Sequence, residues 1–132
     1  MREPRWVLLD VAKAVHARQI GEHGGIHGIR DESLLSSAMD APKNSFHYGV
    51  TSLPELAAKY AHALASNHPF ADGNKRTAYI CMRLFLKLNG YDIKADGAEK
   101  VRLMTSIAAG DMSVEAIAAW LHEHLVEVSR GK

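Results

Sequence analysis

The sequence predicts an all-α fold, a compact single-domain bundle of about six helices, and three observations support this prediction. Apolar residues recur at helical spacing in successive segments. Capping residues precede several of these segments, and glycine or proline follows them. No alternating strand pattern, internal repeat or low-complexity tract is present. The 132 residues are 47% hydrophobic and 23% charged, which fits one domain over residues 1–132 with its own core.

The first half of the chain contains two predicted helices and an irregular segment. Apolar positions at helical spacing predict a helix from Pro4 to about Ile20, followed by a glycine-rich loop. Asp31 can cap a short helix that Pro42 is expected to stop. Residues 42–50 show no helical period, and we expect a short flap or hairpin there.

The second half contains the remaining helices. Ser52, with a glutamate three residues later, forms a capping-box pattern that opens a helix to about Asn67. Residues 74–89 are apolar around most of a helical circumference, which predicts a central helix. Asp96 and Ser113 then cap two further helices.

Composition narrows the range of partners. The 16 basic and 15 acidic residues give a net charge of +1, so neither direct nucleic acid nor a membrane surface is expected as the main partner. The single cysteine, Cys81, lies in an apolar helical stretch and is expected to be buried and unreactive, in keeping with a reducing cytoplasm. The apolar run near the N-terminus is too short and interrupted for a secretory signal or a membrane span.

One segment, residues 68–77, carries the chemistry. The turn Gly73-Asn74 leads directly into a helix, whose first N–H groups lack partners and carry partial positive charge. Glycine permits the close approach of an anion, and the Asn74 amide can donate a hydrogen bond. Lys75 and Arg76 add a point charge and a bidentate fork for phosphate oxygens. These four residues are the predicted phosphate site.

Two residues before that turn suggest catalysis. Asp72 would repel a phosphate unless a divalent cation lies between them, which predicts Mg²⁺. Histidine is the residue type most often used to take a proton at neutral pH, so His68 could accept one from an attacking hydroxyl. Taken singly, a histidine such as His68 more often caps a helix, and an aspartate such as Asp72 more often forms a turn. The Lys75-Arg76 pair would more often be a solvated charge pair, and Phe70 is expected to be core. The occurrence of all these residues together within one ten-residue segment favours a site for phosphoryl or nucleotidyl transfer from ATP.

The same segment resembles the signature of the Fic/Doc superfamily, His-x-Phe-x-Asp/Glu-Gly-Asn-x-Arg, and is most similar to its Doc (death-on-curing) toxin branch. Residues 23–31, 34–38, 42–44 and 85–90 extend the likeness over nearly the whole chain. The resemblance implies a helical bundle with a flap over the active site, matched to residues 42–50. It implies that His68 is the general base, Phe70 the loop anchor and Asp72 the Mg²⁺ ligand.

Two departures from the AMP-transferring branch bear on the reaction. Lys75 stands where those enzymes have glycine, and Tyr79 stands where they have a second arginine. In the Doc branch, the resemblance implies, ATP binds in the reverse direction and the γ-phosphate is transferred. We therefore expect a toxin that acts as a protein kinase. An AMP-transferase with the same residues is the alternative, and a non-catalytic binding module is a third hypothesis.

The resemblance also implies partners. Doc substrates include a threonine of elongation factor Tu, whose modification arrests translation. The inhibitory Ser/Thr-x-x-x-Glu-Gly/Asn motif of Fic proteins has only one near match, at residues 51–56, and it fails at the last position. A separate Phd-like antitoxin, with a disordered tail that folds onto the toxin, is therefore the expected partner.

Overall fold

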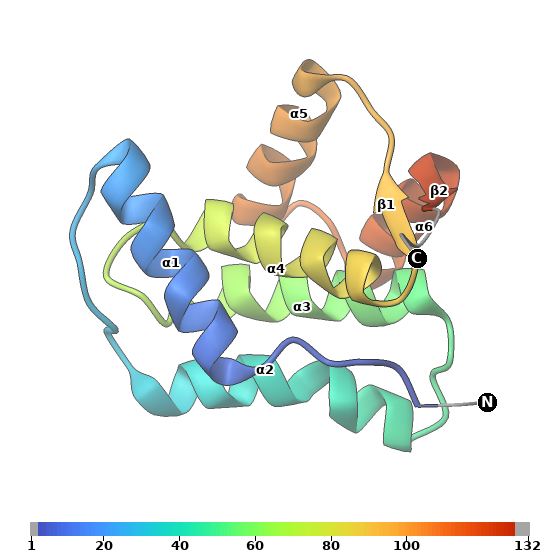
Figure 1. Cartoon of the computed structure of the whole chain (residues 1–132), viewed down its shortest axis with the longest axis horizontal. Coiled ribbons are helices and arrows are strands. Elements are labelled where there is room, and N and C mark those ends of the chain that lie inside the picture. Colours follow the sequence, from blue (N-terminus) through green and yellow to red (C-terminus); the bar gives the residue numbers. More distant parts are fainter. Residues whose placement is uncertain (1–2, 129–132) are drawn as a thin grey trace.

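The computed structural model describes residues 3–128 and is mostly helical. It contains six helices and two short strands: α1 (Leu9–His23), α2 (Glu32–His47), α3 (Leu53–Asn67), α4 (Asn74–Leu88), β1 (Tyr91–Ile93), α5 (Gly97–Ala108), α6 (Val114–His124) and β2 (Leu125–Glu127). The predicted all-α bundle of about six helices is confirmed (Figure 1). Within the described residues, no helix combines the length and apolar character needed to cross a bilayer.

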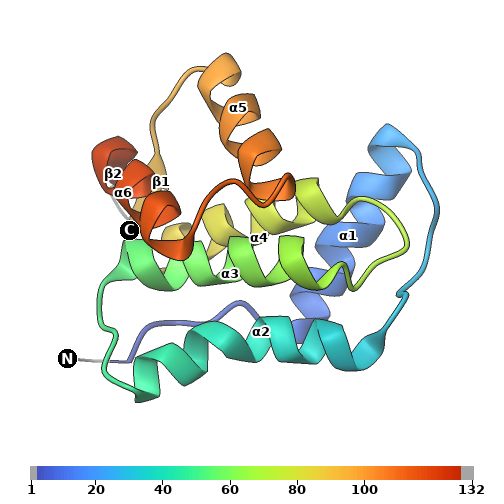
Figure 2. The ribbon, with the colours of Figure 1, turned by 180° about the vertical axis from the view of Figure 1, so that it is seen from behind.

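Helices α3 and α4 lie side by side at the centre of the molecule. Helix α2 packs against α3 on one side and α6 packs against it on another, whereas α1 and α5 pack against α4 (Figures 1 and 2). This arrangement explains the sequence of α4, in which Thr77, Ala78, Cys81, Met82 and Phe85 are all buried. A helix covered on several faces needs apolar residues around most of its circumference.

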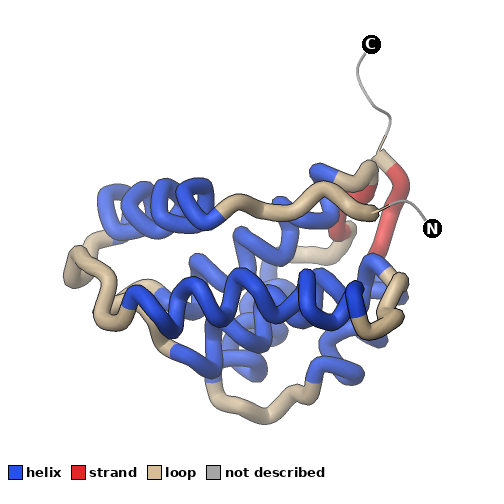
Figure 3. The backbone as a smooth tube through the Cα atoms, turned by 90° about the horizontal axis from the view of Figure 1, so that it is seen from below, coloured by secondary structure: helices blue, strands red, loops and turns tan. Residues whose placement is uncertain are grey.

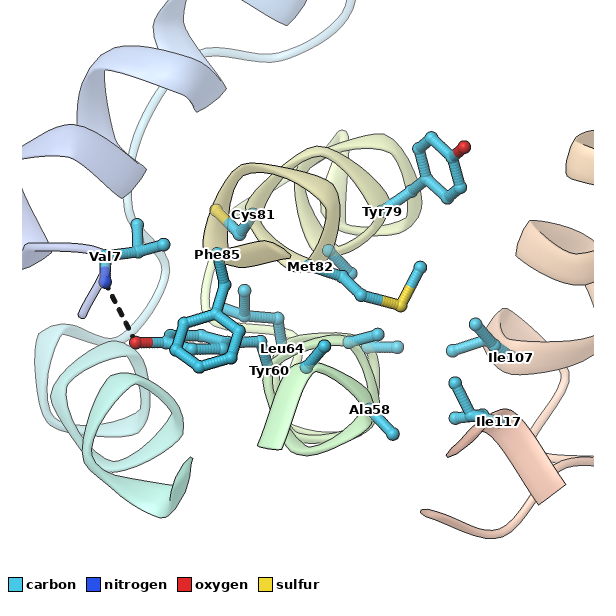
Figure 4. Close-up of a cluster of buried hydrophobic side chains, with 14 of the residues drawn as sticks. Val7, Ala58, Tyr60, Leu64, Tyr79, Cys81, Met82, Phe85, Ile107 and Ile117 are labelled. Carbon is cyan, nitrogen blue, oxygen red and sulfur yellow. Dashed lines mark hydrogen bonds between the residues drawn. The ribbon is translucent and has the colours of Figure 1, made fainter. Parts of the chain in front are cut away.

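The core between the helices is closely packed around α3 and α4. Tyr60 and Leu64 of α3 meet Met82 and Phe85 of α4, with further side chains from α5 and α6 (Figure 4). Cys81 is fully buried, and burial raises the pKa of its thiol to about 12. The thiol is therefore protonated at neutral pH, as expected for a small hydrophobic residue and not for a nucleophile.

The predicted start of the first helix was wrong. Helix α1 begins at Leu9, and residues 3–8 form no helix. In this N-terminal segment the Val7 N–H donates to the Tyr60 hydroxyl at 3.0 Å (Figure 4). The Trp6 ring stacks on Phe85 with centroids 5.6 Å apart. These contacts hold the segment against α3 and α4 without a helix, and they are not visible in the local sequence pattern.

The hairpin or flap predicted near residues 42–50 is also not formed, because α2 continues through Pro42 to His47. Proline removes one intrahelical hydrogen bond and normally ends or kinks a helix. Here Leu35, Met39 and Pro42 are buried together on the face of α2 that packs against α3. Burial of this apolar face offsets the lost bond, so the helix persists for a further turn.

The small strand pair lies elsewhere. Strands β1 and β2 are antiparallel, with Asp92 opposite Val126 (Figure 3). Asp92 also accepts two hydrogen bonds from the Arg83 guanidinium, at 2.8 and 3.1 Å. Arg83 lies on α4, and its ion pair with Asp92 fastens β1 to this helix.

Candidate active site

Two loops meet at the end of the molecule opposite the strand pair. The loop between α1 and α2 runs beside the loop between α3 and α4 (Figure 1). The Arg30 N–H donates to the Pro69 carbonyl at 2.7 Å, and the Ala71 N–H donates to the Gly28 carbonyl at 3.1 Å. These bonds give the loop before α4 a fixed backbone, although it has almost no regular secondary structure.

A pocket of about 520 Å³ lies on this loop and the start of α4. Its lining consists of His68, Ala71, Asp72, Gly73, Asn74, Lys75 and Arg76. All the residues predicted from the sequence to act in catalysis, metal binding or phosphate binding therefore border one pocket. Phe70, predicted as the anchor of the loop, lies beneath it and is 2% exposed.

His68 ends α3 in an unusual backbone conformation. It is the only non-glycine residue with positive φ in the described chain, at φ 47° and ψ 55°, and its side chain is exposed. The Arg30 guanidinium donates to the carbonyls of His68 at 2.7 Å and of Asn67 at 2.9 Å. The last carbonyls of a helix lack partners, so Arg30 caps α3 and fixes the position from which the His68 ring projects.

Asn74 binds the loop itself. Its side-chain oxygen accepts from the Phe70 N–H and its amide nitrogen donates to the Phe70 carbonyl, both at 3.0 Å. The sequence suggested that this amide donates to a phosphate, whereas one of its two N–H groups is used to clamp the loop. Asn74 thus shapes the pocket first, and its own backbone N–H belongs to the open start of α4.

The start of α4 is left without a side-chain cap. Gly73 precedes it in the left-handed conformation, at φ 75°, and no side chain accepts from the first-turn N–H groups. Lys75 and Arg76 are both exposed on this turn. A helix start with free N–H groups and two adjacent cations is an electropositive site of the kind that binds phosphate.

The Asp72 carboxylate is oriented by two backbone donors. Its oxygens accept from the Ile26 N–H at 3.2 Å and from the Gly73 N–H at 2.8 Å. These bonds, first Ile26 and then Gly73, hold the pKa of the Asp72 carboxyl below its ordinary value, so the group is ionised at neutral pH. Gly25 lies so close that an added Cβ would be 2.7 Å from this carboxylate.

The donor set suits a cation shared with a ligand. Within residues 3–128 no group of three or more histidine, cysteine or acidic side chains is placed to hold a metal ion. Asp72 offers one ionised, exposed carboxylate at the edge of the pocket. Mg²⁺ commonly takes one or two carboxylates and completes its shell with phosphate oxygens and water. Asp72 therefore fits Mg²⁺ bound together with a nucleotide.

Sequence analysis missed two residues that shape this site, His16 and Arg30, and the flap that it expected at residues 42–50 does not border the pocket. The segment beside the pocket is the loop between α1 and α2, not residues 42–50. His16 is 4% exposed and lies between Ala12 and Ile20 on the buried face of α1. A histidine at an apolar helical position was the only available signal. Arg30 lies in the upstream segment that resembles the family, but its residue type did not indicate this contact.

Tyr79, the second departure from the AMP-transferase pattern, does not reach solvent freely. It is 8% exposed and lines a smaller cleft of about 200 Å³. Arg76 borders both this cleft and the main pocket. The position that carries a second cation in the AMP-transferring branch is therefore occupied here by a mostly buried aromatic ring.

Comparison with known proteins shows the family to which the chain belongs. The model of the Fic/DOC family matches residues 6–86, which include the whole loop and most of α4. The chain is 39% identical over 103 residues to "Toxin Doc" of Mycolicibacterium smegmatis, covering 74% of this chain and 78% of that protein. It is 34% identical over 106 residues to "Protein kinase doc" of Escherichia phage P1, covering 80% and 83%. The chain belongs to the Fic/DOC family.

Proposed function

We propose that this protein is the toxin of a toxin–antitoxin module and acts as a protein kinase. It would transfer the γ-phosphate of ATP to a serine or threonine hydroxyl of a translation factor similar to elongation factor Tu, and so arrest translation. The observation that carries the proposal is one pocket with His68, an ionised Asp72 and the uncapped start of α4. The similarity of the chain to a phage protein named as a kinase supports transfer of the γ-phosphate.

In this mechanism His68 acts as the general base. Its exposed ring takes the proton of the acceptor hydroxyl as the oxygen attacks the γ-phosphorus. A new oxygen–phosphorus bond forms, the bond to the β-phosphate oxygen breaks, and ADP leaves. Arg30 keeps the His68 backbone in place during this step through its two hydrogen bonds.

The start of α4 holds the phosphates. The first-turn N–H groups, with Lys75 and Arg76, would stabilise the negative charge on the transferring group. Mg²⁺ held by Asp72 would neutralise phosphate charge when the nucleotide is bound. Phe70 and Asn74 act indirectly, because they fix the loop that carries these groups.

A Phd-like antitoxin is the proposed inhibitor. No inhibitory motif of the Fic type is present in the sequence, so control of the pocket would come from another chain. The relative from Mycolicibacterium smegmatis is named as a toxin, which supports a module of this kind.

AMP transfer by the same residues is the second candidate, because family membership alone does not fix the direction in which ATP binds. Two features of this chain favour phosphoryl transfer. Lys75 places a side chain beside the helix start, and Tyr79 replaces a phosphate-binding arginine with a largely buried ring. Both changes alter the part of the site that would hold the outer phosphates in the AMP-transferase direction.

Labelled ATP distinguishes the two candidates. The purified protein is incubated with Mg²⁺, an elongation factor Tu preparation and ATP labelled at either the γ or the α phosphate. We expect label in the protein substrate only from the γ position. Label from the α position would establish AMP transfer instead, and label from neither would exclude this substrate.

Growth arrest tests whether catalysis underlies toxicity. Expression of the wild type should stop growth, whereas His68→Ala and Asp72→Ala should not, because removal of a general base typically costs about 10²- to 10⁴-fold in rate. His122→Ala, which removes an exposed histidine of α6 outside the pocket, is the matched control. Equal toxicity of all four proteins would favour the non-catalytic binding module.

A further inference from the structure

We propose that His16 of α1 is a positioning residue for the active-site loop, acting through the backbone of Asp72. This inference rests on the proposed function for its catalytic consequence. His16 is 56 residues away from Asp72 in the sequence, yet its Nε2 lies 2.8 Å from the Asp72 carbonyl oxygen. A carbonyl oxygen only accepts hydrogen bonds, so Nε2 carries the hydrogen and donates.

This bond complements those on the Asp72 side chain. The carboxylate is held by N–H groups of Ile26 and Gly73, whereas His16 holds the carbonyl of the same residue. Asp72 is thereby fixed at both its side chain and its backbone. The peptide that His16 binds also contains the Gly73 nitrogen, so the bond determines where the backbone enters α4.

Ring packing adds a second constraint. The imidazole stacks on the Phe70 ring, with centroids 3.9 Å apart and planes 5° from parallel. The ring also lies close to Gly73, where an added Cβ would be 3.6 Å from the His16 Cδ2. One side chain from α1 therefore contacts the loop at residues 70 and 72 and lies close to residue 73, next to the groups proposed to bind Mg²⁺ and phosphate.

A buried histidine can have a packing role alone. The hydrogen bond from Nε2 distinguishes a positioning role from such a packing role. The pair His16→Gln and His16→Met tests this. Both variants lose the aromatic ring and have side chains of nearly equal length. Only glutamine can place an N–H donor where Nε2 was. His16→Leu provides a second donor-free variant if methionine prevents folding.

The main readout does not depend on activity. Hydrogen exchange of the Gly73 and Ile26 amides, followed by NMR, reports whether the loop remains ordered. We expect His16→Met to speed exchange about five- to tenfold, in proportion to the loss of one hydrogen bond, and His16→Gln to stay within about twofold of the wild type. The affinity for Mg²⁺ and ATP, by calorimetry, and kcat for label transfer should follow the same order.

Tyr60→Phe is the matched control for stability. It leaves the buried Val7 N–H without its partner, as His16→Met leaves the Asp72 carbonyl, but at a position in the core outside the pocket. The control should lower Tm without changing loop exchange or nucleotide affinity. The inference is wrong if the glutamine and methionine variants behave alike in loop exchange. Absence of label transfer by the wild type would refute the proposed kinase, while the exchange data would still decide the role of His16.

Discussion

Helices α4 and α5 are neighbours that begin in opposite ways. Helix α5 starts with a complete capping box, in which the Asp96 side chain accepts from the Glu99 N–H at 2.8 Å and the Glu99 side chain accepts from the Asp96 N–H. Helix α4 starts at Gly73 with no side-chain cap. Helix α1 also starts without a side-chain cap, but the open start of α4 is the one that lies in the pocket with the predicted site residues.

Three other helices support this interpretation. Asp31, Ser52 and Ser113 each accept a hydrogen bond from a first-turn N–H of α2, α3 and α6. Such a cap stabilises a protein by about 1 kcal/mol. At α4 that stabilisation is absent, and the free N–H groups remain available to an anion. The following predictions test the contrast between a closed and an open start, from the largest expected effect to the smallest.

Closing the start of α4 should abolish transfer. Gly73→Asp places a carboxylate at the N-cap, which would compete with phosphate for the free N–H groups and repel it. We expect phosphoryl transfer to fall about 100-fold or more, since loss of one such donor costs about 10²- to 10³-fold. Label transfer from γ-labelled ATP is the measurement.

Gly110→Asp is the control for the strain in that variant. Gly110 has nearly the same backbone, φ 78° against 75° at Gly73, and an added Cβ there meets no atom within 4 Å. Both variants should lose about 1 to 2 kcal/mol of stability from the left-handed conformation. Gly73→Asp should lose somewhat more, because an added Cβ there lies 3.2 Å from the Ile20 Cδ1. Only Gly73→Asp should lose transfer. Similar activity in the two variants would contradict a role for the open helix start.

The C-terminal cap of α3 should matter less than the start of α4. Arg30→Met removes both hydrogen bonds from the guanidinium to the carbonyls of Asn67 and His68 while keeping an unbranched side chain. We expect kcat to fall about tenfold through misplacement of His68, an order-of-magnitude estimate for a group held indirectly. Arg18→Met, which breaks an exposed pair with Glu22 on α1, should leave kcat unchanged. An unchanged kcat in Arg30→Met would show that the loop holds His68 without the cap.

Opening the start of α5 should affect stability and not activity. Asp96→Ala removes the acceptor of the capping box and should lower the free energy of unfolding by about 1 kcal/mol. This corresponds to a Tm shift of about 3 to 5 °C for a domain of this size. Asp111→Ala, in the loop before α6, removes an exposed aspartate that does not cap a helix and should leave Tm nearly unchanged. Loss of label transfer in Asp96→Ala would mean that the two helix starts are coupled.

The smallest expected effect is a pH dependence where α5 meets α6. The Trp120 carbonyl at 2.7 Å, and then Glu99 at 3.1 Å, raise the pKa of His124 above its ordinary value. Because the folded state binds the proton more tightly, this stabilisation is complete below about pH 6.5 and is lost as pH rises through the raised pKa. Unfolding by urea at several pH values, in the wild type and His124→Gln, measures it. The difference between the two proteins should shrink with rising pH, and a constant difference would contradict the assignment.

Local sequence patterns were sufficient for much of the fold. The caps at Asp31, Ser52, Asp96 and Ser113 form as predicted, because a cap depends on residues within one turn of each other. The helix ends that were predicted wrongly, at residues 4–8 and 42–47, are those where contacts with distant helices outweigh local preference. The small strand pair was missed because three-residue strands carry almost no periodic signal.

The sequence by itself determined the segment 68–76 as one chemical unit, because its parts are adjacent in the chain and a loop leading into a helix brings adjacent residues into one pocket. Only the tertiary structure decided what holds that unit in place. His16 and Arg30 reach it from α1 and from the loop after α1, across separations of 56 and 38 residues. Such contacts depend on how whole helices pack, and helix packing is a property of the complete core that no local spacing encodes.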